Sequence, residues 1–262
     1  MTKAIVTLLT DFGTRDHFTA SVKGALLKQC PGCAIVDITH EVPPFDVRRA
    51  AFLLWASWRS FPQGTAHLAV VDPGVGTGRA FLHMEREGHH FFAPDNGLLA
   101  YVLPGHEHLS RIVFAPELAA KASPTFHARD LFAPCVGKFL NGEIPVQTPF
   151  TTPVLLPYAA PMKLHDGSVA GRVMEVDRFG NLITDLPLEW LAWGRGEISV
   201  GGRTLRRWAA SYEDLTEGEA GLLKGSLGTL EIASRRTSAA KTLGVGAGST
   251  VVYVPQGDGG SR

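Results

Sequence analysis

The sequence predicts an α/β fold, with a mostly parallel N-terminal sheet flanked by helices and a smaller β-rich C-terminal domain. Strand-like and helix-like segments alternate in the first third of the chain, which favours a parallel sheet with crossover helices. The last third holds short strand-like runs separated by glycine turns. The 262 residues are 45% hydrophobic and 19% charged, a composition typical of a globular protein with a sizeable core.

Short apolar runs and four-residue apolar spacings define the N-terminal elements. Phe18, Val22 and Leu26 recur every four residues, as in an amphipathic helix. The predicted order is a strand at 4–9, that helix, a strand at 34–38, a helix within 47–61 and a strand at 66–71. A strand pair at 80–84 and 90–93, a sharp turn at 95–97 and a helix at 131–140, with Pro134 in its first turn, follow.

The composition changes in the middle of the chain, which predicts the domain boundaries. Residues 1–148 are expected to form the α/β domain, 149–166 a proline-rich linker and 167–262 the β-rich domain. Two alternating runs around Gly201-Gly202 predict a hairpin, and strands are expected at 229–233 and 249–254. The polar, glycine-rich end at 256–262 is expected to fray.

Charge and hydropathy exclude several classes of partner. The formal net charge is zero and the isoelectric point about 7.2, so neither a nucleic-acid backbone nor an anionic membrane surface finds a basic region to bind. No stretch is long and apolar enough for a transmembrane helix or a signal peptide, and three cysteines cannot build a disulfide framework. We therefore expect a cytoplasmic protein without nucleic-acid or membrane partners.

Several short motifs invite functional interpretations that the surrounding residues do not support. The glycines at 74, 76 and 78 lack the lysine of a phosphate-binding loop. Cys30 and Cys33 have redox-motif spacing but follow a predicted helix instead of preceding one. The histidines at 89–90 and at 106 and 108 lie in polar segments and are expected on the solvated surface. We expect neither a metal site nor a cofactor.

Acidic residues follow three of the predicted strands. Asp11, Asp72 and the Asp95-Asn96 pair stand at strand ends, where ligands bind in parallel α/β sheets. An aspartate there can equally cap a helix or form a turn. His127 precedes a predicted helix and would lie near these acids. The residues alone thus predict an α/β site of carboxylates with a histidine and leave its reaction open.

Several separate motifs, in one order, resemble a known family. They are Thr10-Asp-Phe-Gly13, Val36-Asp-Ile-Thr-His40, Val42-Pro-Pro-Phe-Asp-Val47, Val71-Asp-Pro-Gly-Val-Gly-Thr77, Ala93-Pro-Asp-Asn-Gly97, Thr125-Phe-His-Ala-Arg-Asp130, Asp177-Arg-Phe-Gly-Asn181, Gly225-Ser226, Leu230-Glu-Ile-Ala233 and Ser238-Ala-Ala240. Together they resemble the S-adenosyl-L-methionine hydroxide adenosyltransferases, which hydrolyse S-adenosylmethionine to adenosine and L-methionine. The resemblance covers nearly the whole chain. It implies a barrel-like C-terminal domain and a homotrimer with sites at the subunit interfaces.

The resemblance implies that Asp72, Arg79 and His127 are the catalytic residues. Halogenating relatives resemble the chain elsewhere but lack this trio. The difference has a physical basis, because a halide needs only desolvation, whereas water, with a pKa of about 15.7, needs groups that orient it and accept its proton. The water-using branch is therefore expected, with S-adenosylmethionine as substrate and no cofactor.

The resemblance also implies which residues bind the substrate. Asp11 would accept hydrogen bonds from the two ribose hydroxyls, and Phe45 and Phe126 would lie beside the nucleoside, although both could instead be core residues. The remaining binding residues would be Asp177, Asn181 and Ser226. Thr184-Asp185 and the Arg235-Arg236 segment depart from the family pattern, and the latter puts the adenine contacts in doubt.

Three alternatives remain open. A halogenase would share the fold, but the Asp-Arg-His trio argues against it. A protein that binds S-adenosylmethionine or adenosine with negligible turnover would need the same binding residues. A thiol oxidoreductase would use Cys30 and Cys33.

Overall fold

The chain folds into two compact units, with the division after Pro157. The computed structural model describes residues 3–157 and 160–256. Residues 158–159 of the predicted linker and residues 257–262 of the predicted frayed end lie outside the described residues. The first unit combines one sheet with helices and the second is built mainly from strands, which confirms the predicted fold class.

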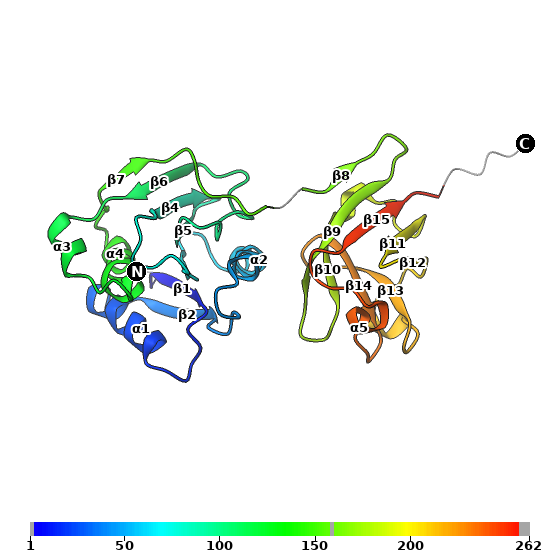
Figure 1. Cartoon of the computed structure of the whole chain (residues 1–262), viewed down its shortest axis with the longest axis horizontal. Coiled ribbons are helices and arrows are strands. Elements are labelled where there is room, and N and C mark those ends of the chain that lie inside the picture. Colours follow the sequence, from blue (N-terminus) through cyan, green and yellow to red (C-terminus); the bar gives the residue numbers. More distant parts are fainter. Residues whose placement is uncertain (1–2, 158–159, 257–262) are drawn as a thin grey trace, which may run out of the picture. The chain divides into compact units, whose positions relative to one another are not determined.

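A seven-stranded mixed sheet forms the first unit (Figure 1). Its elements are β1 (Ile5–Thr10), α1 (Phe18–Gln29), β2 (Ala34–Thr39), α2 (Val47–Ser57), β3 (Ala66–Val70), β4 (Phe81–Arg86), β5 (His89–Pro94), β6 (His108–Ile112), α3 (Pro116–Lys121), α4 (Ala133–Leu140) and β7 (Gln147–Pro149). The strand order is β2-β1-β3-β5-β4-β6-β7. The pairs β1–β2, β1–β3 and β3–β5 are parallel, whereas β4, β6 and β7 add antiparallel pairs.

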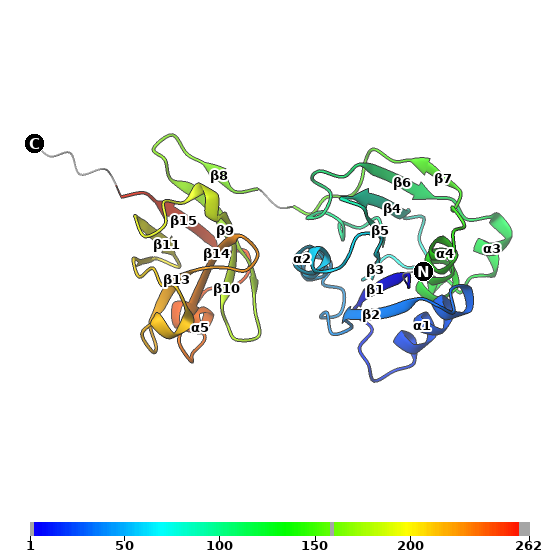
Figure 2. The same ribbon diagram turned by 180° about the vertical axis from the view of Figure 1, so that it is seen from behind.

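The alternation of apolar side chains along β1 explains how helices cover both faces of this sheet. Val6 and Leu8 pack in one buried cluster with residues of α1 and α4. Leu9 points to the other face and packs in a second cluster with Leu54 of α2. Both views of the ribbon show α1 and α2 on opposite sides of β1 and β2 (Figures 1 and 2). The carboxyl ends of the central strands remain at one edge of the sheet, where loops follow them.

The second unit is an almost closed antiparallel barrel with one short helix (Figure 2). Its elements are β8 (Met162–Lys163), β9 (Val169–Val176), β10 (Leu182–Pro187), β11 (Glu197–Val200), β12 (Arg203–Leu205), β13 (Ala220–Lys224), β14 (Thr229–Ser234), α5 (Ala239–Leu243) and β15 (Thr250–Val254). The strand order is β12-β11-β15-β9-β10-β14-β13, and β8 pairs with β9. The segment after β12 joins β13, because Leu222 N donates to Arg207 O and Ala209 N donates to Leu222 O.

Some elements differ from the sequence prediction in their bounds or in their type. The helix within 47–61 is divided into α2 and a 3-10 turn at Trp58–Ser60. The helix at 131–140 begins earlier, as a π-helical turn at Ala128–Phe132, and Pro134 stands in the first turn of α4. His108 begins β6, a strand that the polar sequence around it did not predict. None of the described helices is long and apolar enough to cross a membrane.

Histidines inside the first unit form two hydrogen-bonded pairs. His67 Nε2 lies 3.1 Å from His89 Nδ1, and His83 Nε2 lies 3.3 Å from His90 Nδ1. The prediction of a solvated surface position is wrong for His89, which is 4% exposed, because it packs against Trp58. Burial, with the nearby charges of His89 and His90, lowers the pKa of His67 to about 3. His67 is therefore neutral in the folded protein.

We expect acid to destabilise the first unit through His67. Between pH 6.5 and about 3 the unfolded chain binds a proton at this residue and the folded chain does not, so the stability falls as the pH falls. The His67→Gln variant should lose this contribution, which amounts to at most about 2 kcal/mol between pH 7 and pH 5. Urea unfolding at both pH values measures it. Replacing the exposed His165 by Gln is the control. An unchanged pH dependence in His67→Gln would contradict the expectation.

Candidate active site

The turn that follows β3 carries Asp72 and is held in place by two neighbouring segments. Asn96 Nδ2 donates to the carbonyl of Val71 at 2.8 Å, which fixes the backbone immediately before Asp72. Gly76 has a φ of +83°, and a Cβ there would lie 2.6 Å from the carbonyl oxygen of Pro124. A glycine is thus needed because the two loops touch. The contact brings the loop of Asp72 against the segment that leads to His127.

Arg79 connects the predicted catalytic residues. Its Nε donates to both carboxylate oxygens of Asp72 at 2.9 Å, and its Nη2 donates to Asp72 Oδ2. Its Nη1 lies 3.0 Å from His127 Nδ1. The side chains of Asp72 and Arg79 are only 6% and 11% exposed. The structure therefore brings Asp72, Arg79 and His127, which the sequence separates by up to 55 positions, into one hydrogen-bonded group.

The contact with Arg79 determines the protonation of His127. A guanidinium has donors only, so Nδ1 of the imidazole must accept, and in the neutral ring the proton is on Nε2. Burial and the charge of Arg79 lower the pKa of His127, against the opposing charges of Asp72 and Asp130. His127 is thus a neutral imidazole that can donate a hydrogen bond through Nε2.

A cavity of about 480 Å³ lies beside Arg79 and His127 within the first unit. Its other lining residues are Thr77, Gly78, Ala80, Phe81, Arg111, Ile112, Val113, Phe114, Ala119, Leu131, Phe132 and Thr148. The guanidinium of Arg79 also stands over the ring of Phe132, at 5.3 Å from its centroid. Arg79 and His127 thus have one side next to a largely apolar wall, which strengthens the electrostatic interactions between them.

Asp11 follows β1 at the same edge of the sheet. Its Oδ2 accepts a hydrogen bond from Phe45 N at 2.9 Å. Burial raises the pKa of Asp11, the amide of Phe45 opposes the rise and the charge of Asp72 adds to it. Phe45 has a φ of +68° and is 70% exposed, so it is not a core residue. An aromatic side chain held exposed on a strained backbone is a feature of binding sites.

Phe126 lies inside the first unit. It is 6% exposed, and its ring centroid is 6.0 Å from that of Phe12 and 5.2 Å from that of Phe18. The guanidinium of Arg129 covers its ring at 4.8 Å. In the described unit Phe126 is therefore a packing residue next to His127, and contact with a substrate stays a prediction.

The second unit has its own polar turn, between β9 and β10. Asp177 Oδ1 accepts from the backbone N–H groups of Phe179 and Asn181 at 2.8 and 2.9 Å, and Oδ2 accepts from Asn181 Nδ2 at 3.0 Å. A hollow of about 550 Å³ lies here, lined by Asp177, Phe179, Asn181, Tyr212, Ser234, Arg236, Thr237 and Ser238. Ser226 is exposed in the turn between β13 and β14 and does not line this hollow.

Sequence reasoning missed the contact between Glu231 and Tyr212. The hydroxyl of Tyr212 donates to Glu231 Oε1 at 2.6 Å, and Glu231 is 7% exposed. Burial raises the pKa of Glu231, and the nearby charge of Asp177 adds to the rise. A glutamate within the apolar run Leu230–Ala233 is the signal that could have indicated this buried acid.

The two cysteines with redox-motif spacing, Cys30 and Cys33, are free thiols, and both are buried. Burial and the neighbouring Cys30 raise the pKa of Cys33 to about 11, whereas redox motifs need a lowered thiol pKa. Cys33 therefore does not provide a reactive thiolate. Within 3–157 and 160–256, no cluster of three or more histidine, cysteine or acidic side chains could hold a metal ion.

Comparison with known proteins places the chain in a family. The profile of the SAM hydroxide adenosyltransferase N-terminal domain matches residues 6–148, and that of the corresponding C-terminal domain matches residues 171–252. The chain belongs to the SAM hydroxide adenosyltransferase family. The resemblance inferred from the sequence motifs is thereby confirmed.

Proteins with known names or structures are similar to this chain over most of its length. A protein of Thermus thermophilus named (R)-S-adenosyl-L-methionine hydrolase is 38% identical, over 94% of this chain and 98% of its own. A fluorinase of an Actinoplanes species is 28% identical, over 70% of this chain and 71% of its own. The crystal structure of a conserved protein from Thermotoga maritima has a TM-score of 0.84 and 32% identity, and covers 95% of this chain and 99% of that one.

We expect the charge of Arg79 to control the protonation of His127. Without the guanidinium, in Arg79→Gln, the pKa of His127 should rise, because the carboxylate of Asp72 remains and favours the imidazolium. Nitrogen NMR of the histidine rings measures this pKa and should show the proton of the neutral wild-type ring on Nε2. Arg111→Gln is the matched control, because Arg111 lines the same cavity and does not contribute to the shift. A proton on Nδ1 in the wild type would contradict the assignment.

Proposed function

We propose that this protein hydrolyses S-adenosyl-L-methionine to adenosine and L-methionine. The observation that carries the proposal is the hydrogen-bonded group of Asp72, Arg79 and His127. The relative from Thermus thermophilus, which matches nearly the full length of the chain, bears the name of this activity. The sequence motifs had already indicated the same reaction.

The reaction is an in-line displacement at the ribose C5′. The oxygen of a water molecule forms a bond to C5′ while the bond from C5′ to the sulfonium sulfur breaks, and the sulfur leaves with the bonding pair as the neutral thioether of methionine. The water must also lose a proton. Arg79 favours negative charge on the attacking oxygen, and His127 orients it through Nε2–H. Asp72 is the one anion of the group, so we assign to it the acceptance of the proton.

Substrate binding is assigned to residues of both units. Asp11 would accept hydrogen bonds from the ribose hydroxyls with the oxygen that Phe45 N leaves free, and the exposed ring of Phe45 would lie beside the nucleoside. Phe126 would support this part of the site from the core. Asp177 and Asn181 would bind the methionine and adenine ends, and Ser226 would contact the methionine carboxylate. Arg236, in the segment that departs from the family pattern, lines the same hollow as Asp177 and Asn181.

The remaining parts of the proposal concern assembly and location. We propose a homotrimer with sites at the subunit interfaces, located in the cytoplasm, that acts without metal or cofactor and binds neither nucleic acid nor membrane. Light scattering of the purified protein measures the number of subunits, and activity after treatment with a chelator measures any need for metal.

Two alternatives share this scaffold. A halogenase is suggested by the fluorinase relative, which is 28% identical. The Asp-Arg-His group disfavours it, because a halide neither carries a proton to be accepted nor needs a donor to orient it. A protein that binds S-adenosylmethionine with negligible turnover would keep Asp11 and Asp177 but would have no use for the group around Arg79.

The source of the new oxygen atom tests the proposed reaction directly. Purified protein is incubated with S-adenosylmethionine in ¹⁸O-labelled water that contains chloride, and the products are identified by liquid chromatography and mass spectrometry. We expect methionine and adenosine with one ¹⁸O in its 5′-hydroxyl, because water attacks C5′. A chlorinated nucleoside would establish the halogenase, and an intact but bound substrate would establish the binding protein.

Loss of His127 should separate turnover from binding. In His127→Ala we expect kcat to fall about 10²- to 10⁴-fold, the range for a group that positions or transfers a proton in the transition state. The affinity for adenosine, measured by calorimetry, should change little. His165→Ala, at an exposed position of the second unit, is the control. Unchanged turnover in His127→Ala would remove His127 from the catalytic group.

A further inference from the structure

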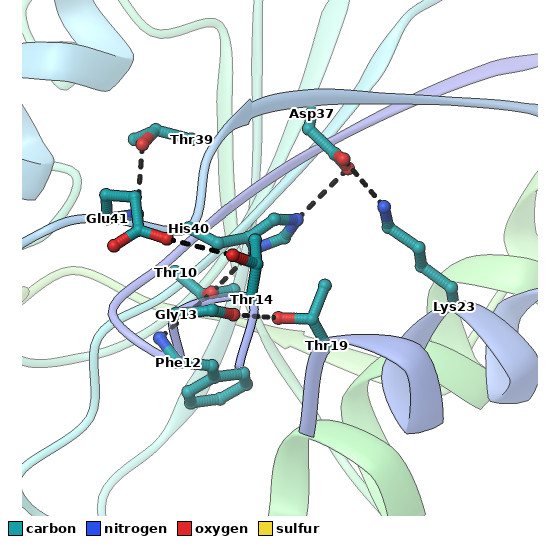
Figure 3. A network of polar contacts seen from close by, with 10 residues as sticks. All are labelled: Thr10, Phe12, Gly13, Thr14, Thr19, Lys23, Asp37, Thr39, His40 and Glu41. Atoms are coloured by element: carbon teal, nitrogen blue, oxygen red, sulfur yellow. Dashed lines mark hydrogen bonds and ion pairs between the residues drawn. The ribbon is translucent and has the colours of Figure 1, made fainter. Parts of the chain in front are cut away.

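A chain of polar contacts that the proposed reaction does not use runs from α1 to the loop after β1 (Figure 3). Its centre is His40, which follows β2 and is 4% exposed. His40 Nε2 lies 3.1 Å from Asp37 Oδ1, and His40 Nδ1 lies 2.8 Å from Thr10 Oγ1. Thr10 is 1% exposed, so its hydroxyl is not available as a nucleophile. The arrangement is therefore suited to holding the imidazole and the hydroxyl in place.

Asp37 lies at ion-pair distance from one side of the imidazole. Lys23 Nζ of α1 lies 2.6 Å from Asp37 Oδ2. Burial acts to raise the pKa of Asp37, but the hydrogen bonds and charges of Lys23 and His40 outweigh it and lower this pKa. A carboxylate that stays ionised favours a proton on the nitrogen that faces it, Nε2 of His40. Nδ1 is then free to accept from the hydroxyl of Thr10.

His40 contacts the β1 loop on both sides of Asp11. On one side its Nδ1 is hydrogen-bonded to the hydroxyl of Thr10, and this hydroxyl also accepts a hydrogen bond from Phe12 N at 3.3 Å. On the other side its carbonyl accepts from Gly13 N at 2.8 Å. Figure 3 shows these residues gathered around the imidazole. The backbone on either side of Asp11 is thus connected to a single residue, His40, that follows the neighbouring strand β2.

A fixed backbone is important for Asp11, because its carboxylate is proposed to accept hydrogen bonds from both ribose hydroxyls. Asp11 Oδ2 accepts a hydrogen bond from Phe45 N, but this bond does not by itself fix the backbone on either side of Asp11. Displacement of a binding group by about 1 Å is enough to reduce activity about 100-fold. The bonds to Thr10, Phe12 and Gly13 remove the backbone shift.

We propose that His40 is a positioning residue for nucleoside binding, which orients the carboxylate of Asp11 toward the ribose hydroxyls through Thr10 and the backbone of the β1 loop. The proposal rests on the proposed function, because Asp11 is assigned to the ribose there. Lys23 and Asp37 act one step further away, by holding the imidazole.

Two matched pairs of variants test it. Thr10→Val removes the hydroxyl and keeps the shape, whereas Thr10→Ser keeps the hydroxyl. His40→Gln can still reach Asp37 but not Thr10, whereas His40→Asn keeps a polar atom near the position of Nδ1. We expect Thr10→Val and His40→Gln to raise the KM for S-adenosylmethionine and the Kd for adenosine about tenfold or more, with kcat within about threefold. Thr10→Ser and His40→Asn should stay close to the wild type.

The ribose hydroxyls provide a readout that a purely structural role would not move. The wild-type protein should bind adenosine more tightly than 3′-deoxyadenosine, because Asp11 contacts the missing hydroxyl. In Thr10→Val the ratio of the dissociation constants of 3′-deoxyadenosine and adenosine should fall toward one, because a misplaced carboxylate binds both ligands poorly. Thr14→Val is the control, because Thr14 is in the same β1 loop but is exposed, and its hydroxyl donates to Glu41 and not to His40. Thermal unfolding verifies that each variant is folded.

The outcomes separate this proposal from the proposed function. Wild-type protein that forms no adenosine from S-adenosylmethionine overturns the hydrolase, and the affinities for the two nucleosides then still test His40. Folded Thr10→Val and His40→Gln that keep the wild-type affinities and preference overturn the positioning role. An equal loss of affinity for both nucleosides, with the preference retained, also overturns it, because the contact would then serve only the fold.

Discussion

The parallel pairing of β1 with both β2 and β3 is the constraint on which the rest of the site depends. Val70 stands beside Thr10 in the register of β1 and β3, so the residues that follow, Asp11 and Asp72, leave the sheet next to each other. β2 ends beside β1 and delivers His40 to the same edge. Parallel strands have their carboxyl ends at the same edge of the sheet, and here two acids and a histidine lie at that edge.

The carboxylates of Asp11 and Asp72 repel each other, and different neighbouring groups offset the repulsion at each of them. Arg79 compensates Asp72 and holds both of its oxygens. For Asp11, burial raises the pKa and the charge of Asp72 adds to the rise, although the amide of Phe45 opposes it. Arg79 also determines which nitrogen of His127 carries a proton. One guanidinium therefore sets the charge, the geometry and the hydrogen-bonding role of the whole group.

Both units orient a carboxylate by bonding it to nearby backbone N–H groups. Asp11 accepts from Phe45 N, and Asp177 accepts from the N–H groups of Phe179 and Asn181. In each unit the same backbone exposes a phenylalanine, 70% in the case of Phe45 and 77% in that of Phe179. An anchored acid beside an exposed aromatic ring suits a ligand that combines hydroxyl or ammonium groups with a flat base, as S-adenosylmethionine does.

The sequence by itself determined the first five strands, the α/β class, the hairpin at Gly201-Gly202 and the family, because these depend on local patterns and on motifs in a fixed order. Only the tertiary structure decided how the residues meet. Arg79 and His127 are 48 positions apart, and their 3.0 Å contact depends on two loops that touch at Gly76. The burial of His89 was likewise decided by the tertiary structure. The physical reason is that burial and hydrogen-bond partners depend on what packs against a residue, which its neighbours in the sequence do not specify.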